Sequence, residues 1–369
     1  MATSTVIIAD IQSDLREKIE GIMDALAPRS LAGQSVLIKP NMVGPSTPEW
    51  GHTTHPDIVR AVVQSCRDRG AKVMVGDNPG GISHNSRNVA RITGILEAAG
   101  DCFTSLAERV VEKKGAISGL PLVVSKAVLE ADYLINLPKF KTHLQMIISG
   151  AIKNTFGYVA GACKARLHLE AANRKRFAGV VCDIFALRPP DLNLMDALTA
   201  IEGNGPCHGG HLRTVNKILA SSDALALDSV MARMMGVSPD ELFIQKEAAA
   251  RGLGNLAEED IEIIGTLTPI KDFKMPVTFR RELMTDGDVQ GLRDLYPADM
   301  MNTRIGIKPL QDPEKCILCG ECAANCPAGA LTVEPDFFID DSCIACFCCV
   351  ELCTRGALGV PENEAFRHY

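Results

Sequence analysis

Short apolar runs alternate with longer amphipathic patterns through residues 1–265 of the chain. The runs are rich in Val, Ile and Leu, as in strands that are buried on both faces. In the regions between them, apolar residues recur at helical spacing, for example over 56–69 and 86–99. This alternation predicts an α/β domain with a mostly parallel sheet flanked by helices. We expect its strands at 5–9, 35–39, 72–76, 133–137, 192–195, 217–220 and 261–264.

The C-terminal part of the chain differs from the rest in cysteine content and in charge. Nine of the 14 cysteines lie between Cys316 and Cys353. Residues 312–369 also hold 10 acidic and 3 basic side chains, which accounts for the whole formal net charge of −7. We therefore expect a domain boundary near residue 311. The predicted order is the α/β domain over 1–265, a connector over 266–311, a small ferredoxin-like α+β domain over 312–358 and a tail over 359–369.

Two cysteine runs of identical spacing dominate this C-terminal part. Each run has the pattern C-x2-C-x2-C-x3-C of bacterial ferredoxins, with Pro327 after the first run and Thr354 after the second. In two-cluster ferredoxins the fourth cysteine of each run ligates the other cluster. The spacing predicts two [4Fe–4S] clusters, one held by Cys316, Cys319, Cys322 and Cys353, the other by Cys343, Cys346, Cys349 and Cys326.

Zinc knuckles and disulfides are the alternatives for these cysteines. Zinc sites mostly use two C-x2-C pairs or include His, and they do not require a repeat of two four-cysteine runs. Disulfide frameworks suit small secreted domains, whereas the N-terminus here has no signal-peptide pattern. Cys348 is an additional thiol that we interpret as a spectator beside the second cluster.

Polar residues follow several predicted strands at their carboxyl ends, where open parallel sheets bind their ligands. A cluster of lysines can donate hydrogen bonds to a carboxylate or phosphate, and a histidine or an acid can transfer protons. We therefore predict a cleft for a small anionic substrate. A solvated basic loop, a structural histidine and helix-capping aspartates are the alternatives. The candidate catalytic residues are Lys139, Lys141, His143, Lys153, Asp77 and Asp196.

Other ligand classes have weaker support. The sequence contains neither G-x-x-x-x-G-K-[ST] nor G-x-G-x-x-G after a strand, so no nucleotide fingerprint is found. A basic stretch from Lys164 to Arg176 is expected to be a solvated face, or a docking site for the acidic ferredoxin-like tail or for an acidic redox partner. Nucleic acid is an unlikely partner because residues 1–311 are neutral overall and few aromatics interleave. No apolar run approaches the ~18 residues of a membrane span, and we expect a cytoplasmic protein.

Several segments resemble, in order, the domain of unknown function 362 family, whose members often carry a ferredoxin-type tail. The resemblance covers roughly residues 5–265 and implies the α/β fold, a cytoplasmic location and iron–sulfur content, but no substrate. The segments that carry it are Ile38-Lys-Pro-Asn41, Thr54-His-Pro56, Gly76-Asp-Asn-Pro-Gly-Gly81, Asn136-Leu-Pro-Lys-Phe-Lys-Thr-His143, Ser149-Gly-Ala-Ile-Lys-Asn-Thr-Phe-Gly157, Leu192-Asn-Leu-Met-Asp-Ala197 and Glu202-Gly-Asn-Gly-Pro206.

Together these observations favour an iron–sulfur oxidoreductase. It would pass low-potential electrons from two [4Fe–4S] clusters to a small anionic substrate in the α/β cleft, and a ferredoxin or a reductase would be its redox partner. Two alternatives stay open: a non-catalytic electron-transfer adapter, and a protein that handles metals or clusters.

Overall fold

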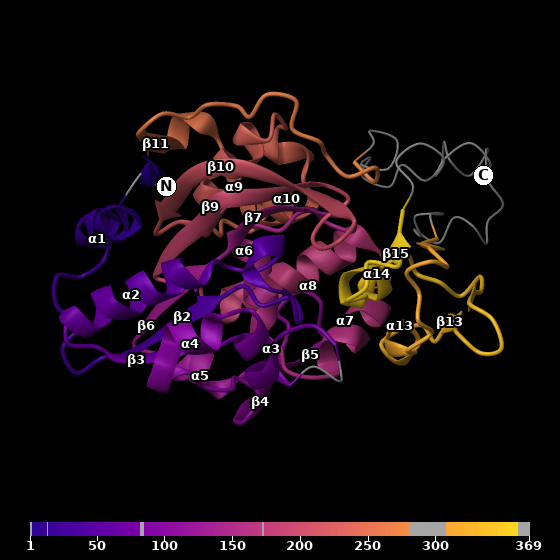
Figure 1. The fold of residues 1–369 in the computed structure, drawn as a ribbon. Coiled ribbons are helices and arrows are strands. Elements are labelled where there is room, and N and C mark those ends of the chain that lie inside the picture. The colour runs from indigo at the N-terminus through magenta and orange to yellow at the C-terminus, as the bar shows by residue number, and fades with distance from the viewer. Residues whose placement is uncertain (1, 13, 82–84, 172, 280–307, 361–369) are drawn as a thin grey trace.

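One mixed sheet forms the centre of the α/β domain (Figure 1). The computed structural model describes residues 2–12, 14–81, 85–171, 173–279 and 308–360. The strand order is β11-β1-β10-β9-β6-β2-β3, with β7 beside β9 and β8 beside β7. The strands are β1 Ser4–Asp10, β2 Ser35–Pro40, β3 Lys72–Val75, β6 Tyr133–Leu137, β7 Lys139–His143, β8 Ile147–Ile148, β9 Leu192–Gly203, β10 Gly210–Ser221 and β11 Ile261–Ile264. A separate hairpin pairs β4 Val110–Lys114 with β5 Pro121–Ser125.

Parallel pairs predominate in this sheet, and helices cover both faces. Strands β3, β2, β6 and β9 are parallel in turn, and only β10 and β8 run antiparallel to their neighbours. The helices are α1 Leu15–Leu26, α2 Pro56–Asp68, α3 Ser86–Ile92, α4 Ile95–Ala99, α5 Lys126–Glu130, α6 Ala151–Asn154, α7 Cys163–Ala171, α8 Arg174–Leu187, α9 Ala224–Met234 and α10 Phe243–Ala250. The predicted fold, a mostly parallel sheet flanked by helices, is confirmed.

Side chains of each central strand enter two cores, because successive residues point to opposite faces of the sheet. In β6, Ile135 and Leu137 join the core that α1 to α4 cover, whereas Leu134 joins the core on the side of α6 to α10. A strand that is apolar on both faces explains the continuous Val, Ile and Leu runs of the sequence.

The sequence places most elements well but misses how far β9 and β10 extend. Strands β6 and β11 have the predicted bounds, whereas β9 continues past residue 195 to Gly203 and pairs with β10 as a long hairpin. Polar residues within β9 led to the wrong end, because they are paired inside the protein rather than exposed in a loop. The helix expected over 86–99 is broken by Gly94, which has a φ of 74°.

The cysteine-rich part is a small α+β unit built from two short antiparallel ladders and two short helices. Strand β12, Leu310–Gln311, pairs with β15, Leu358–Gly359, so the ladder joins the two ends of this unit. Strand β13, Leu331–Thr332, pairs with β14, Phe338–Ile339. Each short helix carries residues of one cysteine run: α13, Glu321–Ala324, belongs to the first, and α14, Cys348–Leu352, to the second.

An apolar contact holds this unit against the α/β domain. Leu144 of the large domain packs with Ala345, Phe347, Val350, Leu358 and Val360 of the cysteine-rich unit. Beside this contact, Asn204 Nδ2 donates a hydrogen bond of 2.8 Å to the Val360 carbonyl. Figure 1 shows α14 next to α7 at this junction, and residues of both helices line one cleft.

The described start of the predicted connector belongs to the large domain. Phe273 and Met275 pack on its core, and the Lys274 carbonyl accepts a hydrogen bond of 2.6 Å from Gly203 N. Residues 280–307 of the predicted connector and 361–369 of the predicted tail lie outside the described residues. Throughout the described ranges, each helix is too short or too polar to cross a bilayer.

Candidate functional site

A cleft of about 120 Å³ lies between the carboxyl ends of the sheet and the cysteine-rich unit. Four of the six candidate catalytic residues, Asp77, Lys141, His143 and Lys153, line it. Cys348 and Glu351 of α14 line the opposite side. The cleft therefore joins the predicted substrate site to the second cysteine run.

Three lysines reach the cleft, and none of them pairs with a carboxylate within the described residues. Lys141 Nζ donates to Asn41 Oδ1 at 2.6 Å and to the His52 carbonyl at 2.7 Å. An ammonium group has three hydrogens, so one remains for a ligand. Because the side chain is fully buried, its charged form is disfavoured, and the pKa of Lys141 falls to about 7.

The other two lysines come from helices on the same side of the sheet. Lys153 of α6 makes no hydrogen bond or ion pair within the described residues, and burial lowers its pKa. Lys164 of α7 donates to the carbonyls of Asn78 and Pro79, and burial lowers its pKa to about 8. His168, one turn along α7, leaves its Nδ1 without a hydrogen-bond partner in the described structure. Lys164 and His168 also line the cleft.

The short helix α6 has a dedicated anchor that fixes Lys153. The Asp228 carboxylate accepts hydrogen bonds from Ala151 N at 2.5 Å and from Ile152 N at 3.2 Å. These are the first two backbone donors of the helix, which have no partner within it. A side chain at Gly150 would overlap Asp228, since its Cβ would lie 2.0 Å from Oδ1. A glycine is therefore needed where the carboxylate meets the helix.

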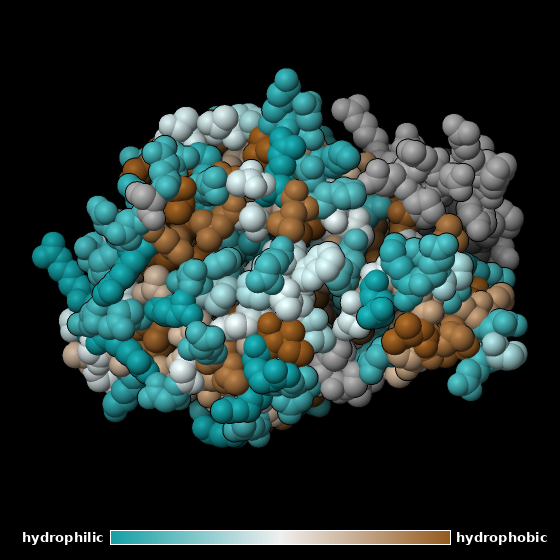
Figure 2. Space-filling view, viewed as in Figure 1, coloured by the Kyte–Doolittle hydropathy of each residue, from teal (hydrophilic) through white to brown (hydrophobic). Residues whose placement is uncertain are grey.

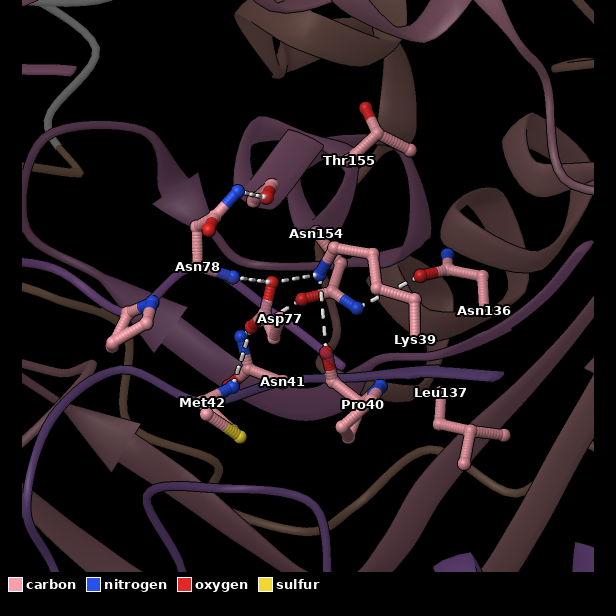
Figure 3. Close-up of polar contacts among 12 residues, drawn as sticks. Lys39, Pro40, Asn41, Met42, Asp77, Asn78, Asn136, Leu137, Asn154 and Thr155 are labelled. Carbon is pink, nitrogen blue, oxygen red and sulfur yellow. Dashed lines mark hydrogen bonds and ion pairs between the residues drawn. The ribbon is translucent and has the colours of Figure 1, made fainter. Parts of the chain in front are cut away.

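Two other buried lysines, Lys39 and Lys139, are neutralised by buried carboxylates. Lys39 Nζ lies 2.8 Å from Asp77 Oδ1 at the floor of the cleft, and Asp77 Oδ2 accepts from Met42 N (Figure 3). Lys139 Nζ lies 2.9 Å from Asp196 Oδ2, and both groups are buried outside the cleft lining. A buried charge is tolerated when it is paired in this way.

Asp196 occupies a different position from the one the sequence predicts. It lies in the middle of β9, not beyond the end of a strand. Its carboxylate accepts from His55 N at 2.8 Å, at the cap of α2, and from Leu198 N at 3.0 Å. With Lys139 as its ion partner, Asp196 connects β7, β9 and α2, and neither residue faces the cleft.

A chain of asparagine amides runs from Lys141 into the domain. Lys141 can only donate, so Asn41 presents Oδ1 to it and turns Nδ2 toward Asn154 Oδ1, at 2.9 Å. Asn154 Nδ2 donates to Asn136 Oδ1 at 2.8 Å, as Figure 3 shows. Asn136 Nδ2 donates to Asn193 Oδ1 at 2.9 Å, and Asn193 donates to the Ser221 carbonyl at 3.3 Å. At one end of this chain Lys141 can only donate, and at the other end the Ser221 carbonyl can only accept. Both ends therefore require the same orientation of every amide between them.

His143 contacts the cysteine-rich unit rather than solvent. Its Nδ1 accepts from the backbone of Gln145 at 3.1 Å and of Met146 at 3.3 Å. The hydrogen of the neutral ring is therefore on Nε2, which lies 3.1 Å from Glu351 Oε1. Burial raises the pKa of the Glu351 carboxyl, but His143 and Lys153 outweigh this effect and lower that pKa to about 2. Burial lowers the pKa of His143 to about 4, so the ring is neutral at pH 7.

The cysteines of the two runs surround two small cavities. All 14 cysteines of the chain are free thiols. One cavity has Cys316, Cys319, Cys322 and Cys353 in its lining, and the other has Cys343, Cys346, Cys349 and Cys326. This is the crosswise grouping that the spacing predicts. Left-handed backbone at Leu318 and at Ala345, with φ of 51° and 47°, turns each loop so that its cysteines face one cavity.

Sequence reasoning missed Asn41, Lys164, His168 and Glu351. The expectation of a solvated basic face over 164–176 is wrong for two residues. Lys164 lines the cleft, and Arg174 is buried and donates to the carbonyls of Leu144 and Thr278 at 3.2 Å, whereas Lys175 and Arg176 are exposed as expected. Lys164 and His168 are four residues apart on a helix, which could have indicated one face. Glu351 carried no such signal, because its role depends on how the cysteine-rich unit docks.

Comparison with known proteins agrees with this architecture. The sequence profile named Domain of unknown function (DUF362) matches residues 36–233, which is more than half of the chain. The chain belongs to this family. A 4Fe-4S binding domain profile matches residues 309–332, so the chain combines a DUF362 domain with a 4Fe-4S ferredoxin-type domain.

One curated relative and two solved structures resemble the chain. The Thylakoid-associated protein sll1697 of Synechocystis is 33% identical over 261 residues, which cover 69% of this chain and 75% of that protein. The lactate racemase apoprotein from Thermoanaerobacterium thermosaccharolyticum has a TM-score of 0.40 and 15% identity, over 64% of this chain and 58% of that one. A protein from Thermotoga maritima has a TM-score of 0.37 and 11% identity, over 66% and 60%. The chain thus spans less than two thirds of either solved structure.

The pair Lys39–Asp77 leads to a prediction about the floor of the cleft. A Cβ at Gly157 would lie 2.1 Å from Asp77 Oδ1 and 2.7 Å from Lys39 Nζ. Gly157→Ala should therefore separate this buried pair and cost about 3–5 kcal/mol in the free energy of unfolding. Gly21→Ala on α1 is the matched control, because a Cβ there meets nothing within 4 Å. Chemical denaturation of both variants measures the difference, and equal stability would show that the pair does not constrain this position.

Proposed function

We propose that the chain is an iron–sulfur oxidoreductase that delivers electrons, through two [4Fe–4S] clusters held by its cysteine runs, to a small anionic substrate in the cleft. The observation that carries this proposal is the composition of the cleft: three lysines without carboxylate partners face the helix that bears Cys348 and Cys349. A reducible anion bound there would lie against the second cysteine run.

The charge of the cleft supports an anionic ligand. Lys141, Lys153 and Lys164 supply three positive charges when protonated, and Glu351 supplies one negative charge. Asp77 is already matched by Lys39. Desolvated ammonium groups are costly, and a carboxylate or phosphate ligand would repay that cost through charge-assisted hydrogen bonds. The size of the cleft, about 120 Å³, suits a molecule of a few heavy atoms.

Lys141 is the side chain that best fits the role of proton donor. Its pKa of about 7 lies near neutral pH, where a general acid is most effective, and its remaining hydrogen is available to a ligand. Lys153 and Lys164 would bind and orient the anion. His143 instead holds Glu351, because one ring nitrogen accepts from the backbone and the other faces the carboxylate.

The cysteines fit the cofactor that the ferredoxin-type domain implies. Each of the two cavities is lined by four thiols in the crosswise order of two-cluster ferredoxins. Within the described residues no group of three or more His, Cys, Asp and Glu side chains is placed to hold a single metal ion. Ala357 N donates to Cys353 Sγ at 3.2 Å, a type of contact that tunes cluster potentials. When bound, each cluster would supply one-electron transfer at low potential. Cluster ligands must be reduced thiols, so we also propose a cytoplasmic setting.

The crosswise grouping predicts which cluster each cysteine supports. Cys353→Ser removes a thiol from the cavity of Cys316, Cys319 and Cys322, although it lies in the second run. Iron in anaerobically purified protein should fall from about eight to about four atoms per chain, and the remaining paramagnetic signal of the dithionite-reduced protein should be that of the other cluster. Cys207→Ser, a buried cysteine outside both cavities, is the control. Four irons in the wild type, or none, would contradict two clusters.

A binding experiment separates an enzyme with a substrate cleft from an adapter without one. Inorganic phosphate and succinate serve as probe anions in calorimetry of the iron-loaded protein. Lys153→Met should weaken the affinity of the anion that binds by about tenfold or more, since a charge-assisted hydrogen bond contributes ~1.5–3 kcal/mol. Lys175→Met, on the exposed side of α8, should leave it unchanged. The bound anion should also shift the spectrum of the reduced second cluster. If neither anion binds the wild type, or if both variants bind equally, the cleft is not an anion site.

The pKa values of the cleft lysines predict how this binding depends on pH. An anion favours the protonated form of Lys141, whose pKa is about 7 in the free protein. Affinity should therefore decrease as pH rises above 7, with proton uptake on binding. Lys164, with a pKa of about 8, adds a second decrease one unit higher. Lys141→Met should remove the first decrease and keep the second. Calorimetry from pH 6 to 9 in buffers of different ionisation enthalpy measures the uptake, and an affinity independent of pH would contradict it.

A further inference from the structure

The two halves of the cysteine-rich unit have the same spacing but opposite surroundings. A shift of 27 positions relates Ile317 to Ile344, Leu318 to Ala345 and Gly320 to Phe347. In the second half, Ala345 is 4% exposed and Phe347 is 1% exposed, because both pack against Leu144 of the large domain. In the first half, Ile317 is 62% exposed and Leu318 is 49% exposed.

The cysteines follow the same asymmetry. Cys346 of the second half is buried, whereas its counterpart Cys319 is exposed. One cavity therefore faces the interior beside the substrate cleft, and the other opens to solvent behind two apolar side chains, Ile317 and Leu318, that line it. Figure 2 shows apolar side chains gathered on the outer part of this unit, over α13. Exposed aliphatic side chains on a loop of cluster ligands are costly unless another surface covers them.

The charged residues near the apolar patch of Ile317 and Leu318 indicate what kind of surface could cover it. The described part of the unit, residues 308–360, contains eight acidic and three basic side chains. Glu314 precedes Ile317 by three residues, and Glu334 and Asp336 flank Val333 and Phe337, which line the same cavity as Ile317. These three carboxylates make no ion pair within the described residues, whereas Lys315 is held by Asp312 at 2.7 Å. Arg355 is the cation that also lines this cavity.

We propose that Ile317 and Leu318, with Glu314, Glu334 and Asp336 around them, form the docking surface for an electron-carrier protein that has a positively charged rim around its own redox group. Each encounter moves one electron from the reduced partner to the oxidised one, and no bond forms or breaks. The apolar centre excludes water, and the opposite charges steer the approach. A second copy that docked through the same face, or an anionic lipid surface, would bring like charge to this acidic unit, so both fit less well.

This inference rests on the clusters of the proposed function but not on the ligand of the cleft. A basic c-type cytochrome with an exposed haem edge is the probe. Calorimetry of the two oxidised proteins measures affinity, and stopped-flow mixing of dithionite-reduced protein with the oxidised cytochrome measures electron transfer. Both are recorded at 20 and 300 mM salt, since the Debye length falls from about 20 Å to about 6 Å over this range.

The patch and the charges are tested with separate pairs of variants. Ile317→Ser with Leu318→Ser should raise the Kd about tenfold. Ile117→Ser with Ile264→Ser, which are at least as exposed on the large domain, should not change it. Glu314→Lys with Glu334→Lys should weaken binding at 20 mM salt and flatten the salt dependence. Glu108→Lys with Glu112→Lys, on the exposed hairpin of the large domain, is the charge control. Iron content should be the same in all variants, because none of these residues is a thiol.

Each remaining outcome contradicts a defined part of the proposal. A wild-type protein that holds eight irons but does not bind the cytochrome at 20 mM salt overturns the docking surface alone. Equal affinity of the Ile317→Ser/Leu318→Ser variant and of its Ile117→Ser/Ile264→Ser control would likewise overturn the docking surface alone. A wild-type dimer in light scattering that the patch variant abolishes would assign the surface to a second copy instead. A wild-type protein without iron would overturn the cluster assignment, and with it both proposals.

Discussion

Buried positive charge is the constraint around which this structure is arranged. Five lysines lie at or near the carboxyl ends of the strands, and moving an ammonium group out of water is costly. Two of them, Lys39 and Lys139, meet that cost with buried carboxylates at 2.8 and 2.9 Å. The other three converge on one cleft, where, among the described residues, Glu351 is the carboxylate not already paired with a lysine. A fold that pairs some lysines so closely and leaves neighbouring ones unpaired concentrates positive potential at a single point.

The cysteine-rich unit completes this site rather than simply being attached to it. It supplies Glu351, the carboxylate that faces the three lysines, and the helix that closes the cleft. The apolar contact around Leu144 and Phe347 fixes the distance between the two parts, and His143 fixes the carboxylate. The same helix carries Cys349, so packing that positions the charge also positions the second cysteine run. The cleft and the cysteine-rich unit therefore cannot be positioned independently.

Periodicity was sufficient to predict the sheet, and spacing was sufficient to group the cysteines, because both depend on local sequence. The membership of the cleft was predicted only in part. Asp77, Lys141, His143 and Lys153 converge as expected, but Lys139 and Asp196 pair with each other away from the cleft. That distinction depends on how far β9 extends and on a register shift between β7 and β9 at Lys139 and Lys141, which no local pattern encodes. Lys164 was missed for the same reason, since the packing of α7 decides whether a basic residue meets solvent or the cleft.

The two halves of the cysteine-rich unit share one cysteine spacing but differ in their surroundings: the second half contacts the large domain, and Ile317 and Leu318 of the first half are exposed. Identical ligand spacing in the two halves places no constraint on the residues between the cysteines, and these have diverged in size. Phe347 and Val350 fill the contact with the large domain, and their counterparts Gly320 and Ala323 are too small to form such a contact. At these two positions the second half has more apolar surface to bury against Leu144, which favours docking through this half. Once the second half is buried beside the cleft, the first half must face solvent. The orientation of the unit thus follows from the side chains between the cysteines rather than from the cysteines themselves.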